Sequence, residues 1–289
     1  MEQLEKPTIE SEVNPLVKFF ESRGYENVRT TRIRSLNAIL YATRDKKECF
    51  IKKFNPRDRS EELILGRIKT EMACYEHLPS DILIDVIEPN IEESYLVLKK
   101  VDLVDTGKDQ QSFLEIMDLC LTRFPQIDAS FLPQISWEHY EELFGKMKNV
   151  EAAGIIQGAD SIIETFKDRK ALLMNSRMVF SHQDFDRRNI KKADGKLKIF
   201  DFELSIRNNI LADMAALYID IKDEENLVDT FEKRIKESEL YDEELFSLMI
   251  IRRGTLFVNS FVNKLEEAGK FKLLQNHIDI LRETTSNHK

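Results

Sequence analysis

The stretch FSHQDFDRRNIKKADGKLKIFDFELS, residues 180–205, gathers side chains that could carry out a reaction. His182, Asp184 and Asn189 follow the spacing H-x-D-x4-N, and Asp201 begins DFE twelve residues after the asparagine. Carboxylate and amide oxygens suit Mg²⁺, which usually takes one or two protein ligands and completes its shell with water and phosphate oxygens. Asp184 could also accept the proton of a substrate hydroxyl. The stretch therefore predicts phosphoryl transfer, in which positioning and charge neutralisation carry most of the catalysis.

The surrounding residues predict how these side chains are positioned. Residues 178–181 and 196–202 are rich in strand formers, and Asp194-Gly195 is a tight-turn pair typical of hairpins. Such a turn would fold the asparagine and the DFE aspartate back toward each other. Each acid taken alone would be interpreted as a turn or surface residue. Their joint spacing instead favours one site in which three oxygen-bearing side chains converge on a divalent ion.

The wording HQDFDRRN followed by IFDFE resembles the aminoglycoside phosphotransferase and choline kinase superfamily, whose pattern is roughly H-G-D-x4-N and then I-D-F/W-E/D. The resemblance implies that Asp184 is the catalytic base and that Asn189 and Asp201 are magnesium ligands. It also implies that His182 orders the loop. Asp213 in LADMAAL resembles the downstream aspartate that braces the catalytic loop in that family. ATP and Mg²⁺ are the cofactors that the resemblance implies.

The N-terminal part offers a second point of resemblance. Family members carry a strand lysine that contacts the nucleotide phosphates and an acid on the next helix that orients it. FIKKF followed by KTEMACYEHL supplies Lys52 and Glu71 for these places. Side chains alternate along a strand, so Lys52 and Lys53 face opposite sides, and we prefer Lys52 for the nucleotide side. Residues 95–100 would then be the hinge whose backbone meets adenine.

The sequence also departs from the family pattern. Residues 34–38 (RSLNA), where a phosphate-covering turn is expected, contain no glycine, and glycine favours close backbone approach to phosphate. Gln183 replaces the usual small residue of the loop. Asp186 stands where serine- and threonine-directed protein kinases usually have lysine, DFE replaces DFG, and no APE-like sequence follows. These departures argue against a protein kinase.

The periodicity of the chain changes along its length and predicts an α+β, two-lobed, protein-kinase-like fold. The N-terminal lobe is expected to be an antiparallel sheet with a helix, and the larger C-terminal lobe mainly helical. We place the nucleotide-binding lobe at residues 1–98, the hinge or crossover at 99–105, and the catalytic and acceptor-binding lobe at 106–289. Strands are predicted at 28–34, 37–43, 48–54, 82–87 and 94–98, besides those of the catalytic stretch.

Helices are predicted from apolar stripes and capping residues. The first has Asn14 as its cap, Pro15 in its first turn and Gly24 after its end. Another is ended by Pro79, and Ser136 starts one whose stripe of Trp137, Tyr140 and Phe144 we interpret as core rather than as an aromatic cage for a quaternary amine. The predicted helices cover 61–78, 136–150, 159–175, 211–220, 224–238, 242–266 and 271–282.

Composition limits the class of protein. The net charge of −9 over 289 residues argues against a nucleic-acid-binding surface. The three cysteines, Cys49, Cys74 and Cys120, fit neither a disulfide framework nor a zinc site, so they are expected to be reduced. The N-terminal residues lack a basic segment followed by an apolar one, and Arg252 and Arg253 interrupt the longest apolar stretch. We therefore expect no signal peptide, no membrane span and a cytoplasmic location.

The expected activity is ATP-dependent transfer of the γ-phosphate to a hydroxyl of a small molecule, such as an aminoglycoside, an amino alcohol or a sugar-like compound. The acidic run at residues 220–225 lies where related enzymes place substrate-binding acids, which suggests an amine-bearing acceptor. Two alternatives stay open: a protein or polysaccharide kinase, and an inactive pseudokinase that serves as a binding module. The sequence does not identify the acceptor, the choice between ATP and GTP, or the oligomeric state.

Overall fold

The computed structural model describes residues 9–33, 37–54, 60–262 and 272–286. The chain forms two compact units. The first unit comprises Met1–Leu103 and Ala193–Glu203, and the second comprises Val104–Lys192 and Leu204–Lys289. The boundary between the two falls within the predicted crossover, and the first unit also takes in the short segment that ends in DFE.

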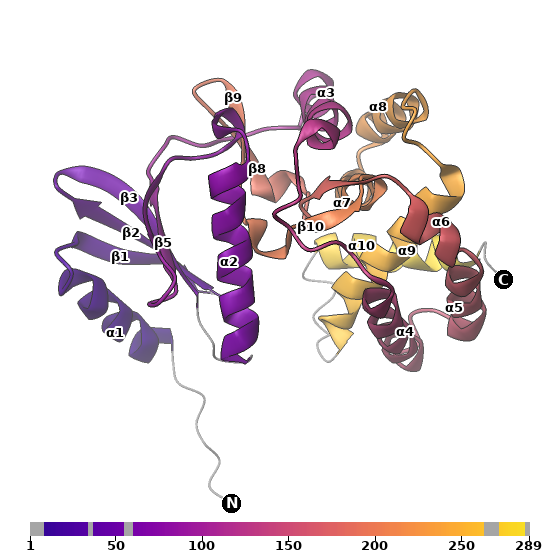
Figure 1. The fold of residues 1–289 in the computed structure, drawn as a ribbon, viewed down its shortest axis with the longest axis horizontal. Helices are drawn as coiled ribbons and strands as arrows, with labels where there is room; N and C mark the ends of the chain where they lie inside the picture. Colours follow the sequence, from indigo (N-terminus) through magenta and orange to yellow (C-terminus); the bar gives the residue numbers. More distant parts are fainter. Residues whose placement is uncertain (1–8, 34–36, 55–59, 263–271, 287–289) are drawn as a thin grey trace, which may run out of the picture. The chain divides into compact units, whose positions relative to one another are not determined.

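An antiparallel sheet of five strands forms the first unit, with the strand order β1-β2-β3-β5-β4 (Figure 1). β2 and β3 pair in register over their whole length, because they are joined by the short turn at Asp45-Lys46, both in the left-handed conformation. The elements of this unit are α1 (Ile9–Glu21), β1 (Glu26–Ile33), β2 (Asn37–Arg44), β3 (Lys47–Phe54), α2 (Glu61–His77), β4 (Val86–Asn90), β5 (Tyr95–Lys99) and β9 (Lys196–Ile199).

The two faces of β3 meet different helices, as strand alternation requires. Ile51 belongs to a buried cluster that includes Phe20 of α1, while Phe54 packs against Ile64 and Ile68 of α2. Phe20 also makes an edge contact with Tyr95 of β5, at 5.2 Å between ring centroids. α1 and α2 therefore cover opposite faces of the sheet, and the face toward α2 is the one that carries Lys52.

Two predicted elements of this unit are wrong in their limits. α1 begins at Ile9, so Pro15 lies inside the helix and Asn14 is not its cap. The sequence predicts a first-turn proline, whereas the helix accommodates Pro15 in its interior, where the proline lacks the N–H that would bond to the preceding turn. The strand predicted at 82–87 begins only at Val86, after a 3₁₀ turn at Ser80–Ile82. The residues at 82–84 are buried without strand pairing. Apolar residues alone do not distinguish a buried strand from a buried segment that pairs with no strand.

The second unit is mainly helical, and α9 is packed against α4, α7 and α10 (Figure 1). Its strands are short: β7 pairs antiparallel with β10, and β6 with β8. The elements are β6 (Val104–Asp105), α3 (Gln110–Asp118), α4 (Trp137–Ala152), α5 (Ala159–Asp168), α6 (Lys170–Asn175), β7 (Met178–Ser181), β8 (Ile190–Ala193), β10 (Ile206–Asn209), α7 (Leu211–Ile221), α8 (Glu225–Lys236), α9 (Glu243–Asn259) and α10 (Lys272–Ser286).

Most predicted helices of this unit are present, with differences at their ends. Ser136 caps α4 through a reciprocal contact with His139, as a capping residue should. The helix predicted at 159–175 breaks into α5 and α6 at Arg169. The helix predicted at 242–266 ends at Asn259, and residues 263–266 lie outside the described part of the chain. α3 was not predicted, although Asp109 caps it.

The aromatic stripe of α4 is buried at Tyr140 and half-buried at Trp137 and Phe144. Tyr140 stacks on Trp137, and Phe144 contacts Phe166 of α5. Trp137 also has the Lys170 ammonium over its ring, at 4.6 Å from the centroid, so the stripe packs as core at Tyr140 and is partly exposed at its two other rings.

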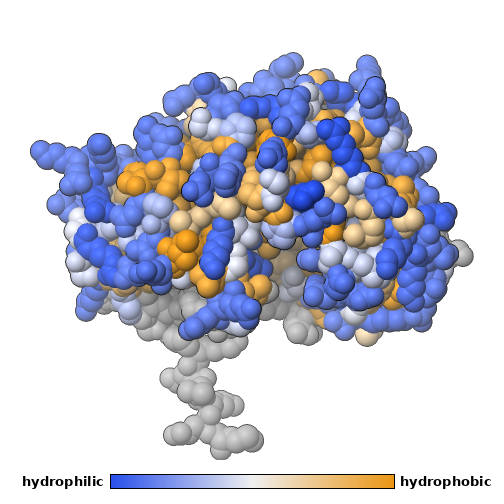
Figure 2. All heavy atoms as spheres, viewed as in Figure 1, coloured by the Kyte–Doolittle hydropathy of each residue, from blue (hydrophilic) through white to orange (hydrophobic). Residues whose placement is uncertain are grey.

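The surface follows the charged composition. On the face drawn in Figure 2, hydrophilic side chains predominate and apolar ones lie among them. Within the described residues, no helix combines the length and the apolar character that a membrane crossing requires. All three cysteines are buried and form no disulfide.

Candidate active site

Lys52 is the centre of a buried charge cluster in the first unit. Its ammonium lies 2.5 Å from a carboxylate oxygen of Glu71 on α2 and 2.5 Å from one of Asp201, and 3.2 Å from Glu203. Lys53, by contrast, points to the other face and donates to the Glu93 carbonyl. Lys52 and Lys53 therefore lie on opposite faces of the sheet, as strand alternation predicts, and Lys52 is the one beside Glu71.

The cluster holds more negative than positive charge. Burial alone would lower the pKa of Lys52, but the carboxylates of Glu71, Asp201 and Glu203 outweigh it and raise that pKa. Burial also raises the pKa of the Glu71 carboxyl, and the two other acids add to this effect. Arg67 pairs with Glu203 at 2.7 Å. Two cations thus face three carboxyl groups in a largely buried place, and the raised pKa of Glu71 shows that the two cations do not fully compensate the acids there.

The three carboxylates lie close enough together to share a cation, and the Lys52 ammonium contacts all three of them. One carboxylate oxygen from each of Glu71, Asp201 and Glu203 lies within 4.8 Å of the others. Oxygen atoms of this kind are the hard ligands that Mg²⁺ prefers. Asp201 has a positive φ of 67°, so the chain leaves the extended conformation there and β9 ends at Ile199 instead of the predicted 202. This turn of the backbone is what sends the Asp201 carboxylate to Lys52.

In the second unit, Asp213 of α7 fixes the start of the loop that carries Asp184. Its two carboxylate oxygens accept the backbone N–H groups of His182 and Gln183, both at 2.8 Å. Asp213 and His182 are both fully buried. Burial raises the pKa of Asp213, and the nearby His182 and the two N–H groups oppose that rise. The two residues that the resemblance assigned to support of the site, His182 and Asp213, are thus joined by a hydrogen bond, and their supporting role stays a prediction.

Asp184 and Asn189 lie together farther along this loop. The Asn189 amide donates to both the backbone carbonyl and a carboxylate oxygen of Asp184, at 2.9 and 3.0 Å. The other carboxylate oxygen of Asp184 accepts from Arg253 at 2.5 Å. Although burial alone would raise the pKa of Asp184, the Arg253 guanidinium lowers it well below its usual range. Asp184 is therefore ionised and held in a fixed orientation.

Gln183 occupies a backbone conformation that suits glycine better. Its φ is 67°, in the left-handed region where a side chain costs about 1 kcal/mol or more. Two contacts hold it there: the Gln183 amide donates to Ser181 Oγ at 2.6 Å, and Arg253 donates to its carbonyl at 2.9 Å. The replacement of the family's small residue is thus accommodated by specific bonds.

The predicted site residues fall into two groups. Lys52, Glu71 and Asp201 meet in the first unit, whereas Asp184 and Asn189 meet in the second. That oxygens of Asp184, Asn189 and Asp201 converge on one ion stays a prediction from the spacing of these residues. The glycine-free turn includes residues 34–36, which lie outside the described part of the chain.

The prediction missed two residues. Glu203 is the last residue of DFE, and Arg253 is one of two arginines in an apolar helix; both are buried. The sequence signal for both was a charged residue within an apolar segment. Such a residue is almost never buried without a partner, so it indicates a buried ion pair.

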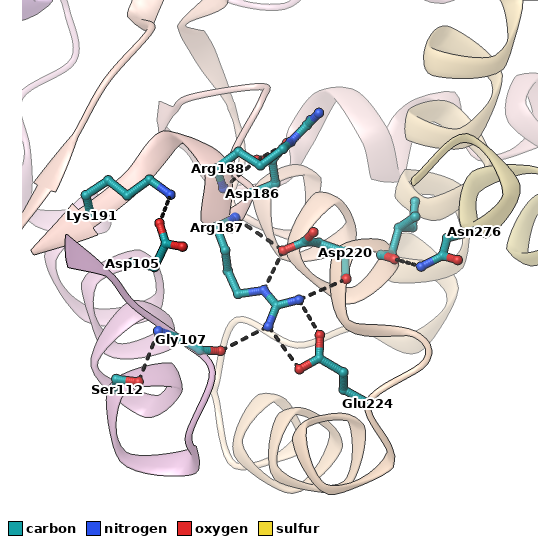
Figure 3. A network of polar contacts seen from close by, with 11 residues as sticks. Asp105, Gly107, Ser112, Asp186, Arg187, Arg188, Lys191, Asp220, Glu224 and Asn276 are labelled. Atoms are coloured by element: carbon teal, nitrogen blue, oxygen red, sulfur yellow. Dashed lines mark hydrogen bonds and ion pairs between the residues drawn. The ribbon is translucent and has the colours of Figure 1, made fainter. Parts of the chain in front are cut away.

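The acidic run at residues 220–225 does not stand free in the structure (Figure 3). Arg187 of the catalytic loop bonds to Asp220 at 2.7 Å and to Glu224 at 2.5 Å, and it also donates to the Gly107 carbonyl. Burial opposes the charge on Arg187, but these two acids raise its pKa above the ordinary value. A cavity of about 380 Å³ lies beside this network. Two acids that suggested an amine-bearing acceptor are thus already paired within the protein.

The chain has the two-lobed, protein-kinase-like fold of small-molecule phosphotransferases, which confirms the predicted fold class. Choline kinase LicA from Streptococcus pneumoniae is similar in structure, with 16% identity, a TM-score of 0.65, and coverage of 95% of this chain and 98% of its own. Aminoglycoside phosphotransferase APH(4)-Ia has 10% identity, a TM-score of 0.67, and coverage of 94% and 98%.

Spectinomycin phosphotransferase APH(9)-Ia, solved with ADP and spectinomycin, has 10% identity and a TM-score of 0.63 over 97% of this chain and 99% of its own. LicA has also been solved with AMP, and a mutant of APH(4)-Ia with ADP and hygromycin B. No protein-family model matches the sequence, and no curated protein matches it significantly. At 10–16% identity, the likeness to these choline and aminoglycoside phosphotransferases shows that the chain has their fold.

Proposed function

We propose that this protein is a kinase that transfers the γ-phosphate of ATP to a hydroxyl group of a small molecule, with Mg²⁺ as cofactor. Lys52, oriented by Glu71, would contact the nucleotide phosphates, and Asp201 and Asn189 would hold the metal. Asp184 would accept the hydroxyl proton. The nucleotide complexes of the structurally similar phosphotransferases support ATP as the donor.

The charge cluster around Lys52 carries this proposal. Three carboxylates share one buried ammonium and one arginine, and their oxygens are close enough to share a cation. An ion pair for stability alone would need only one acid, because each further buried carboxylate adds a desolvation cost. The excess acid is what a site for Mg²⁺ and a nucleotide requires. When bound, Mg²⁺ would neutralise charge on the phosphates.

The residues of the second unit support the proton-transfer step. Asp184 is ionised, and Arg253 and Asn189 fix its orientation while Asp213 fixes the backbone immediately before it. A base held in this way does not have to be ordered during the reaction, and such positioning accounts for a large part of the rate of phosphoryl transfer. His182 lies within the same buried loop and belongs to its support rather than to proton transfer.

Acceptor-dependent ADP release tests this proposal. The panel holds hydroxylated amines, sugars, nucleosides and hydroxy acids, together with protein and glycan acceptors, each with MgATP. We expect a small hydroxylated compound to stimulate release, and Asp184→Asn to lower turnover by about 10² to 10⁴ while ATP still binds. Asp194→Asn is the matched control, because Asp194 is an exposed turn residue whose left-handed φ asparagine tolerates.

The alternatives give different results in the same assay. Phosphate transfer to a protein or glycan and to no small alcohol would favour the protein or polysaccharide kinase. Absence of any stabilisation by MgATP in thermal unfolding would favour the pseudokinase, since a ligand that binds only the native state raises stability by mass action.

A further inference from the structure

α9 carries two adjacent buried arginines within an apolar helix. Arg252 and Arg253 are each only 9% exposed. Burying a guanidinium costs several kcal/mol unless it is paired and hydrogen-bonded. Two such residues side by side also repel each other. Their presence therefore calls for acceptor groups nearby.

The acceptors supplied by the protein satisfy only part of this pair. Arg253 uses two nitrogens for Asp184 and the Gln183 carbonyl, but its buried Nε has no hydrogen-bond partner within the part of the chain that the structure describes. Arg252 forms no hydrogen bond or ion pair with any residue in the described ranges. Burial lowers the pKa of Arg252, and Tyr140 and Asp213 are the groups that oppose this from neighbouring helices.

Among the described residues, further buried polar groups without a partner lie on α9 and on the helices around it. These include the Tyr140 hydroxyl on α4 and the Thr255 hydroxyl on α9. Arg252 and the Arg253 Nε can only donate, and each hydroxyl can donate. His277 Nε2 also has no hydrogen-bond partner among the described residues, and because His277 Nδ1 lies 2.7 Å from the Leu273 carbonyl and so carries the proton, Nε2 is an acceptor. The N–H groups of Arg252 and the Nε–H of Arg253 still outnumber this acceptor, and a place with more donors than acceptors is complementary to an oxyanion, which only accepts.

This place is next to the proposed base. Arg253 touches Asp184 at 2.5 Å, and the acceptor hydroxyl must come within hydrogen-bond reach of that same carboxylate. Atoms a few bonds from the hydroxyl would therefore lie close to Arg253 and its neighbour. Guanidinium groups bind carboxylates and phosphates in a planar, two-pronged manner.

We propose that the acceptor carries an anionic group, a carboxylate or a phosphate monoester, which binds to Arg252, the Arg253 Nε and the Tyr140 hydroxyl. The proposal rests on the proposed function, because it names the acceptor class of that site. It differs from the amine-bearing acceptor suggested by the acidic run, of which Asp220 and Glu224 are occupied by Arg187.

Thermal unfolding with anions as probes tests the anion site. The whole protein is saturated with MgADP, so that phosphate cannot bind in its place, and is then titrated with inorganic phosphate or with malonate. At about ten times the dissociation constant we expect the melting temperature to rise by roughly 3 °C. Whether phosphate or malonate gives the larger rise distinguishes a phosphate monoester from a carboxylate.

Arg252→Met is the decisive variant. Because it removes a buried charge that has no ion pair among the described residues and keeps an apolar chain of similar length, we expect an equal or higher melting temperature without anions and loss of the anion-dependent rise. Arg177→Met, at an exposed arginine of the same unit, is the control and should keep the rise. Arg252→Lys keeps the charge and should retain a weakened rise.

Three results would overturn the proposal: no rise in the wild type with either anion, an equal rise in Arg252→Met, or loss of the rise in Arg177→Met. A large fall in the melting temperature of Arg252→Met without anions would also contradict it, because the guanidinium would then have a structural partner. The shift caused by MgADP itself is recorded separately. Its absence would contradict the proposed kinase function and not the anion site.

Discussion

Replacing Asp213 by asparagine should loosen the loop that carries Asp184 without changing any residue of that loop. The Asp213 carboxylate accepts two backbone N–H groups at 2.8 Å each, from His182 and Gln183. Asparagine has the same shape, but one of its two ends is an NH₂ group that cannot accept. One backbone N–H would then be left buried, without a partner, and facing another donor.

The magnitude follows from that lost bond. A hydrogen bond to a charged group contributes about 1.5–3 kcal/mol, and an unsatisfied buried donor costs a similar amount. Removing the buried charge offsets part of this, since burial already raises the pKa of Asp213. We expect a net loss of about 2 kcal/mol, or roughly 4–8 °C in melting temperature. A displacement of about 1 Å at Asp184 would lower turnover by about 10².

Thermal unfolding and ADP release measure the two effects. Asp229→Asn makes the same chemical change at an exposed position on α8 and should stay within about 0.5 kcal/mol of the wild type. If Asp213→Asn were as stable and as active as the wild type, Asp213 would not act as a two-oxygen acceptor. The argument that it braces the loop would then be refuted.

Three further changes have definite expected results. Burial lowers the pKa of His277 to about 3, so below pH 6.5 this side chain binds fewer protons in the folded than in the unfolded protein. Between pH 7 and 5.5 the free energy of unfolding, measured in urea, should therefore fall by about 1.3 kcal/mol more in the wild type than in His277→Leu. Equal losses in the two proteins would contradict this. Arg253→Met should destabilise by about 3 kcal/mol because it leaves Asp184 without its cation, and adding Asp184→Asn should restore part of that loss; simple additivity of the two changes would argue against the ion pair. Gln183→Ala should lower stability by about 1 kcal/mol, since it keeps the left-handed backbone and loses the bond to Ser181, and an unchanged stability would show that this bond contributes nothing.

Much of the candidate site could be predicted because its residues are close in sequence or lie on regular elements. The contact of Asn189 with Asp184 spans five residues, and the contact of Lys52 with Glu71 follows from strand alternation and from one following helix. The residue type at each place also limits the chemistry it can perform. These local constraints act in any fold that has the same strands and helix.

The rest depended on contacts between distant parts of the chain. Arg253 is 69 residues from Asp184, and nothing in its own helix indicates that it reaches the loop. Asp220 and Glu224 were expected to contact a substrate, but in the structure they pair with Arg187, which is 33 and 37 residues away in the sequence, and so hold the loop that carries Arg187. A charge pattern shows that a partner is needed, but only the tertiary structure shows which one.

The central claim is that Asn189 and Asp201 serve the same magnesium ion and nucleotide. Calorimetric titration of MgATP into the wild type, Asn189→Ala and Asp201→Ala tests it most directly. We predict that each substitution weakens MgATP binding by about tenfold or more, which is ~1.4 kcal/mol, and that binding of ATP without Mg²⁺ changes much less. If either substitution left MgATP affinity unchanged, the two residues would not share an ion, and the proposed site would be wrong.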